Sequence, residues 1–282
     1  MVAGKVMMDR HAPDELCDNP DNSYSDSKEL IEKWHNKGRL RYAVTPRFAP
    51  TSSSSQLNQA ARLLNEYPSD NQTKGVLLQT HLNENDEEIA WVNDLFPDSN
   101  SYFGVYEDHG ITGNRSVFGH CIHNTEEEYQ RMAKTGSKVS LCPTSNLFLG
   151  SGLFELEKLE SYGIDVSLAS DVGGGDSFSM FKVMNEAYKI CRLNDFNLDP
   201  IKAFYLTTLG AAKVLDMNDS IGNFEVNKEA DFIVIDLNAT EIISQKNKIA
   251  MGVNDILFNL MTLGDDRLID EVFILGQRAY KK

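Results

Sequence analysis

Six short apolar runs alternate with amphipathic segments up to residue 172, and this alternation limits the possible folds more than any other feature of the sequence. The runs are VAGKVMM, RYAVTPRF, VLLQTHL, SVFGHCIH, KVSLCPTSN and DVSLASDV. They have the length and residue types of buried strands, whereas the connecting segments repeat apolar residues at helical spacing. Strands that alternate with helices at this interval form a parallel sheet with right-handed crossovers.

A doubly wound sheet and a (β/α) barrel both fit this alternation, and two observations favour the barrel. Polar residues gather at the ends of several strands, where barrel enzymes assemble their sites: Arg47, His81, His120, Asn146 and Asp171. No G-x-G-x-x-G follows the first strand, and the glycine run at 173–175 indicates only a flexible turn. Since a closed barrel of this type needs eight strands, we expect an α/β fold with an incomplete (β/α)8 TIM-type barrel of about six strands.

The sequence changes character after residue 217. Residues 224–237 alternate and are rich in branched side chains, residues 253–264 are helical in pattern, and residues 271–280 indicate another strand. We therefore predict a partial barrel, the catalytic domain, at residues 1–217. Residues 218–282 are predicted to be the C-terminal segment of a small β-sandwich domain with a helix.

Charge and cysteine content exclude several classes of protein. The formal net charge of -15 would repel a phosphate backbone or an anionic lipid surface, so we expect neither nucleic acid nor membrane as a partner. The four cysteines are widely spaced and form no C-x-x-C pair, which argues against a zinc knuckle and against a secreted disulfide framework. The sequence shows neither the apolar run of a signal peptide nor that of a spanning helix. A cytoplasmic location is expected.

Three strand ends carry residues suited to metal chemistry. His81 ends the strand VLLQTHL and begins an H-x-x-E with Glu84, while His120 and Asp171 occupy comparable positions on later strands. Each residue alone has a structural explanation, as a core histidine or as the cap of a turn. A barrel brings strand ends together, and histidine and aspartate are good zinc ligands. The combination therefore favours metal-dependent hydrolysis.

Arg47 and Phe48 end another strand, in the run Thr45-Pro46-Arg47-Phe48. Arg47 has two open interpretations, a surface cation or a planar donor fork for a substrate carbonyl, with Phe48 stacked on the substrate ring.

Five motifs, in order, closely resemble the strand-end motifs of guanine deaminases in the amidohydrolase superfamily: VTPRFAPT, QTHLNEN, GHCIH, CPTSNLFLGSG and ASDVGGGDSFS. The later GNFEVNKEADFIVIDL resembles the segment by which amidohydrolases return to a small β-sandwich. The similarity extends from about residue 3 to the C-terminus.

The resemblance implies hydrolytic deamination of guanine to xanthine and ammonia, with one zinc ion per complete site. His81 and Asp171 would be direct zinc ligands, and His120 would orient the activated water. Asp171 would accept the proton of this water, and Glu84 would protonate the ring nitrogen and then the leaving amine. Arg47 and Phe48 would hold the purine, with His81, Glu84 and Asp171 also facing it. The complete enzyme is expected to be a homodimer.

The sequence departs from the family pattern in one respect. The family supplies two more zinc ligands from an H-x-H at the end of the first barrel strand, and these 282 residues contain no H-x-H. We therefore expect an N-terminally truncated form that binds zinc weakly or not at all and has little activity. Two alternatives remain open: another amidohydrolase deaminase or chlorohydrolase of a nitrogen heterocycle, or an inactive remnant with only a structural role.

Overall fold

The computed structural model describes residues 1–282 and contains one larger sheet and one small sheet. Neighbouring strands of the larger sheet follow the order β1-β3-β4-β5-β6-β7, and β2 also pairs with β3. Its strands are β1 (Val2–Ala3), β2 (Val6–Met7), β3 (Arg41–Pro46), β4 (Leu77–Leu82), β5 (Ser116–His120), β6 (Lys138–Leu141) and β7 (Val166–Leu168). The pairs from β1 to β5 are parallel, which confirms the predicted α/β fold with an incomplete barrel sheet.

All six predicted strand runs contain strand, although the strand of the fourth run ends at His120 and that of the sixth at Leu168. Two further differences have a clear physical cause. The first run is divided into β1 and β2 at Gly4, where an added Cβ would lie 1.7 Å from the carbonyl oxygen of Ala43. The fifth run was predicted to continue to Asn146, and this is wrong beyond Leu141. Pro143 occupies the first turn of helix α6 (Pro143–Leu149), a position that suits proline because it needs no backbone donor, so Asn146 lies in a helix.

Residue contacts divide the chain into two compact units, and the division falls inside β6. Unit 1 comprises residues 1–139 and 162–164, and unit 2 comprises residues 140–161 and 165–282. This division lies within the sheet and not near residue 217, so it does not test the predicted domain boundary there, which stays a prediction.

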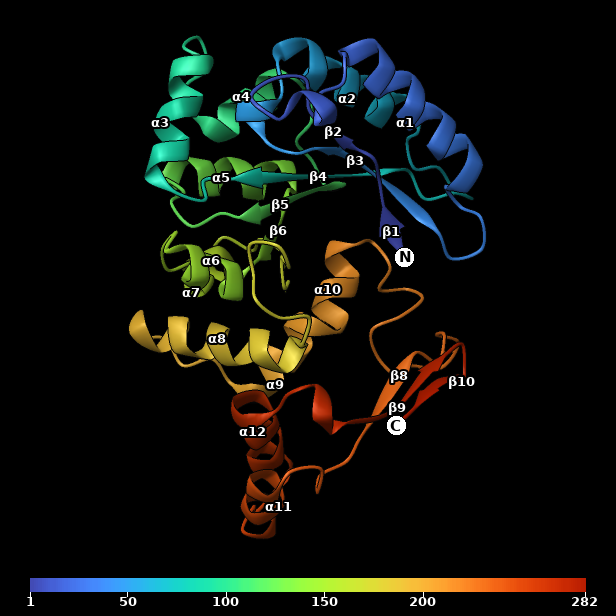
Figure 1. The fold of residues 1–282 in the computed structure, drawn as a ribbon, viewed down its shortest axis with the longest axis vertical. Coiled ribbons are helices and arrows are strands. Elements are labelled where there is room, and N and C mark those ends of the chain that lie inside the picture. Colours follow the sequence, from blue (N-terminus) through green and yellow to red (C-terminus); the bar gives the residue numbers. More distant parts are fainter. The chain divides into compact units, whose positions relative to one another are not determined.

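Unit 1 packs helices against the strands β1 to β5. Helices α1 and α2 contact each other and both contact β3 (Figure 1). The helices are α1 (Pro20–Trp34), α2 (Ser54–Glu66), α3 (Asp86–Leu95), α4 (Tyr102–Asp108) and α5 (Glu126–Thr135). Each begins after a residue whose side chain accepts a hydrogen bond from the first turn: Asn19, Ser53, Asn85, Ser101 and Thr125. Thr125 and Glu128 form a capping box at the start of α5.

Unit 2 combines helices with the small antiparallel sheet. Its helices are α6, α7 (Leu156–Ser161), α8 (Met180–Leu193), α9 (Pro200–Thr207), α10 (Leu209–Val214), α11 (Glu241–Lys248) and α12 (Val253–Leu263). The sheet has the order β10 (Gln277–Lys281), β9 (Ile269–Ile274) and β8 (Phe232–Ile235). Residues 271–280, predicted as one strand, form a hairpin because Leu275 and Gly276 both adopt positive φ, as a tight turn between antiparallel strands requires.

No helix of the structure has both the length and the apolar character needed to cross a membrane.

Candidate functional site

His81 and His120 are brought together by the register of two parallel strands. Leu82 of β4 pairs with His120 of β5, and His81 pairs with Gly119. The two imidazole rings stack with centroids 5.0 Å apart and an interplanar angle of 21°. Strand pairing therefore places the two residues at neighbouring positions. An extended backbone would point their side chains to opposite faces of the sheet, and the left-handed backbone of His120 (φ 69°) departs from that geometry where the rings meet.

A backbone carbonyl sets the tautomer of His81. Its Nδ1 lies 2.6 Å from the carbonyl oxygen of Arg47, which can only accept a hydrogen bond, so Nδ1 carries the proton. The neutral ring then has its lone pair on Nε2. Histidines that bind metals commonly donate their second ring nitrogen to a carbonyl in this way. His81 is thus prepared to act as a ligand through Nε2.

Arg47 and Phe48 lie beside the same histidine. The Phe48 ring contacts His81 edge-on, with centroids 5.8 Å apart, and the Arg47 guanidinium carbon lies 4.9 Å from the centre of the Phe48 ring. Arg47 is exposed and Phe48 is partly exposed. A planar substrate next to His81 would therefore find both an aromatic face and a donor fork.

Glu84 reaches the second histidine from the loop after β4. Its Oε2 lies 3.6 Å from Nε2 of His120, a side chain that is almost completely buried. Left-handed backbone occurs on both sides of this contact, at Asn83 (φ 50°), His120 (φ 69°) and Cys121 (φ 52°). Such conformations cost about 1–3 kcal/mol each and cluster at functional sites. We call residues 81–84 and 120–123 the β4–β5 corner.

Glu88, which the sequence analysis missed, adds a second carboxyl close to Glu84. Burial raises the pKa of Glu88 to about 7; the nearby Tyr102 hydroxyl opposes this shift, and the negative charge of Glu84 adds to it. The side chain lies at the third position of α3 and is 7% exposed. Sequence gave a weak signal, because the acidic first turn of α3 is also what a solvated helix start contains.

Asp171 lies in unit 2, just after β7, and begins a turn that closes on itself. Asp171 has a φ of 46°, and its carbonyl accepts hydrogen bonds from the amides of Gly174 (3.1 Å) and Gly175 (2.6 Å). A Cβ added at Gly175 would lie 2.1 Å from the carbonyl oxygen of Ser170. The glycine run was predicted as a flexible turn, but at Gly175 close backbone packing is what requires a glycine. We call residues 171–175 the β7 turn.

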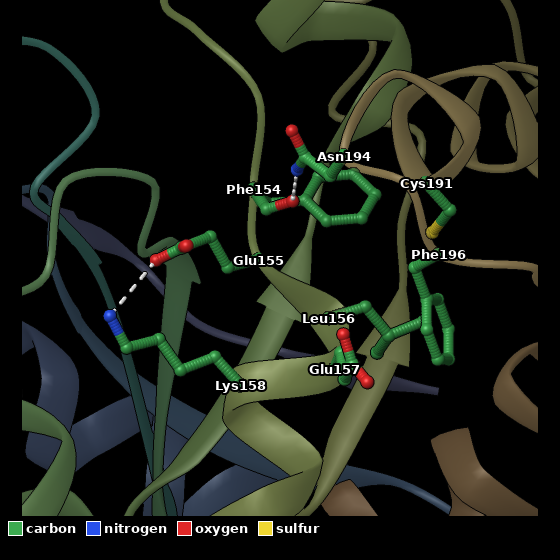
Figure 2. A pocket seen from close by; sticks show the side chains of 8 residues that line it. All are labelled: Phe154, Glu155, Leu156, Glu157, Lys158, Cys191, Asn194 and Phe196. Carbon is green, nitrogen blue, oxygen red and sulfur yellow. Dashed lines mark hydrogen bonds and ion pairs between the residues drawn. The ribbon is translucent and has the colours of Figure 1, made fainter.

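Two cavities contain none of the predicted site residues. A cavity of about 80 Å³ in unit 2 is lined by the side chains in Figure 2, where the Asn194 amide donates to the carbonyl of Phe154. Burial raises the pKa of Cys191, another lining residue, to about 12, with the charge of Glu160 adding to the shift. The thiol therefore stays protonated and is a poor nucleophile. A larger cavity of about 510 Å³ in unit 1 lies beside Leu30 and Trp34.

The profile of the amidohydrolase family matches residues 1–279. The chain belongs to the amidohydrolase family. This amidohydrolase is 49% identical to guanine deaminase of Escherichia coli over 282 residues, which cover 100% of the chain and 63% of that protein. The family expected from the five motifs is therefore confirmed.

Solved structures give the same result for this amidohydrolase. The E. coli guanine deaminase structure matches with a TM-score of 0.96 and covers 100% of this chain, which spans 65% of that structure. Guanine deaminase from Bradyrhizobium japonicum matches with a TM-score of 0.93 at 38% identity, over 100% of this chain and 66% of its own. Guanine deaminase from C. acetobutylicum, solved with guanine in the active site, matches with a TM-score of 0.87 at 31% identity. The match covers 98% of this chain and 64% of that structure. The chain thus spans slightly less than two thirds of the length of these relatives.

Proposed function

We propose that this chain takes part in the zinc-dependent hydrolytic deamination of guanine to xanthine and ammonia. The observation that carries the proposal is the β4–β5 corner, where a carboxylate meets two stacked histidines beside an arginine and an aromatic ring. Hydrolysis of an aromatic amine needs a proton carrier, a means of activating water and a platform for a planar ring. The similarity to guanine deaminases supports guanine as the substrate.

The donor atoms of the chain fit a zinc site. His81 and His120 offer ring nitrogens and Asp171 offers a carboxylate oxygen, and these donor types suit zinc. We assign His81 and Asp171 as ligands, since Nδ1 of His81 is committed to a carbonyl and Nε2 has the lone pair. Zinc, when bound, would supply hydroxide near neutral pH by lowering the pKa of water.

The remaining side chains would handle protons and substrate. Asp171 would take up the proton released from water, and His120 would orient that water. Glu84, next to His120, would protonate first the ring nitrogen and then the departing amine. The Arg47 fork would pair with the purine carbonyl while Phe48 covers the ring.

Ligand number sets the expected metal affinity. The chain offers two of the four ligands that we assign to the zinc site, and the family's other two come from an H-x-H that these 282 residues lack. We therefore expect weak zinc binding and little turnover from this chain, until a segment bearing the H-x-H completes the site. The homodimer and the cytoplasmic location stay predictions.

The test compares this chain with a completed enzyme, made by joining the chain to the H-x-H-bearing segment of a guanine deaminase. Both are loaded with zinc, analysed for metal and incubated separately with guanine, adenine and a chlorinated triazine. The proposal expects xanthine from the completed enzyme and only weak zinc binding by the chain alone. Turnover of another substrate in preference to guanine would favour a different heterocycle hydrolase. Full zinc occupancy without turnover of any of them would favour a structural role.

A further inference from the structure

The β4–β5 corner is tied together beyond the end of its strand pairing. The amide of Cys121 donates to the carbonyl of Leu82 at 2.9 Å. The carbonyl of Asn83 then accepts from the amides of both Ile122 and His123, each at 3.1 Å. One peptide oxygen of the loop that carries Glu84 therefore holds the loop that follows His120.

The side chain of Asn83 is anchored just as firmly. It is 1% exposed, and its Nδ2 donates to Oδ1 of Asn124 at 2.8 Å and to Oε2 of Glu128 at 3.0 Å. Because both amide hydrogens have acceptors, the amide has one preferred orientation. These bonds also oppose relaxation of Asn83 from its left-handed backbone, which would swing Glu84 away from His120.

Glu128 lies at the centre of this network. It is 2% exposed, and its carboxylate accepts from the Thr125 amide at 3.0 Å, the Thr125 hydroxyl at 3.3 Å, Asn83 and the Phe103 amide at 3.1 Å. A capping box accounts for the contacts with Thr125. It does not account for the bonds to Asn83 and to the start of α4. Every partner is a donor, so the site suits a carboxylate better than an amide.

We propose that Glu128, acting through Asn83, is a positioning residue that keeps the Glu84 carboxylate beside His120. Glu84 directly follows Asn83, and its contact with His120 spans 3.6 Å. The catalytic consequence rests on the proposed deaminase function, in which Glu84 moves protons, whereas the structural claim concerns only the corner itself.

The test uses three variants of the 282-residue chain. Asn83→Gly removes the amide but tolerates positive φ, and Glu128→Gln replaces an acceptor oxygen with a donor. Thr125→Ala is the control, since it weakens the helix cap while leaving the bond between Asn83 and Glu128. Nuclear magnetic resonance follows amide exchange at Ile122 and His123 and the through-space contact between Glu84 and the His120 ring.

We expect Asn83→Gly and Glu128→Gln to speed exchange of both amides by about tenfold or more and to weaken the contact between Glu84 and His120, while Thr125→Ala preserves both. If Asn83→Gly behaves like Thr125→Ala in both measurements, the proposal is overturned, and this holds even where Glu128→Gln does not fold. In the completed enzyme, Asn83→Gly should lower kcat with KM unchanged. If the completed enzyme without the substitution does not turn over guanine, the proposed deaminase function is contradicted. The amide exchange measurement then still decides whether Glu128 and Asn83 position Glu84.

Discussion

The β4–β5 corner and the β7 turn hold strained backbone in different ways. In the corner, Asn83 keeps a left-handed conformation because its side chain is bound by Glu128 and Asn124, and the left-handed His120 contacts Glu84. In the turn, Asp171 has a similar conformation, but Gly175 packs against the carbonyl oxygen of Ser170 at a distance that excludes a Cβ. We therefore expect the activity and stability that depend on the corner to change when hydrogen bonds or charges are altered. The stability that depends on the turn should change when side-chain volume is added.

The largest effect is expected at Glu84, the proposed proton carrier of the corner. In the completed enzyme, Glu84→Gln keeps the shape of the side chain but removes its exchangeable proton, so kcat should fall by a factor on the order of 100 to 10,000. Metal content should hardly change, whereas His81→Ala should lose zinc. Steady-state kinetics with metal analysis measures both. Near-normal kcat in Glu84→Gln, or loss of its zinc, would show that Glu84 is not the shuttle.

Arg47→Ala should affect substrate binding more than the chemical step. The change removes the donor fork beside Phe48, and we expect a loss of about 2–4 kcal/mol in kcat/KM, mainly through a higher KM. Arg192→Ala is a control, since Arg192 is an exposed arginine at the end of α8. An unchanged KM for guanine in Arg47→Ala would place the arginine outside the substrate site.

The buried carboxyl of Glu88 should make the corner sensitive to pH. Its folded pKa of about 7 exceeds the ordinary value of 4.5, so its contribution to stability is fully present below about pH 4.5 and is lost as the pH rises through 7. Relative to Glu88→Gln, the wild-type chain should lose about 3 kcal/mol of unfolding free energy over that range. Denaturant unfolding of both proteins from pH 4 to 8 measures the difference. Parallel pH curves would mean that Glu88 ionises normally.

Gly175→Ala tests the volume limit of the β7 turn. The new methyl group would meet the carbonyl oxygen of Ser170, and we expect a stability loss of about 1–3 kcal/mol. Gly252→Ala is the matched control because nothing lies within 4 Å of its added Cβ and its φ is -176°. Thermal or urea unfolding compares the two. If Gly175→Ala and Gly252→Ala are equally stable, the turn accommodates the added methyl group. The turn would then not be limited by volume, contrary to the comparison with the corner.

Much of the fold could be predicted because its signals are local. Each predicted strand run contains strand, and α5 and α9 begin after Thr125 and Asp199, residue types that favour the N-cap position. The sequence is less informative where backbone conformation, and not side-chain pattern, determines the end of an element. Thr208 adopts φ -125° and ψ -97° and separates α9 from α10, and no side-chain pattern signals this break.

The site was only partly predictable from sequence. His81, His120 and Glu84 could be found because they follow strands, and parallel strands align their ends. Asn83 and Glu128 could not, because their importance comes from a bond between residues 45 positions apart. The spacing of Thr125 and Glu128 indicates only a capping box, which is a local pattern.

The most direct test of the central claim is the product balance of the completed enzyme when zinc is removed and restored. The account predicts one xanthine and one ammonia for each guanine consumed, loss of turnover after chelation, and recovery in proportion to zinc added back. Guanine that stays unchanged at full zinc occupancy, or xanthine formation that continues at the same rate without metal, would contradict it.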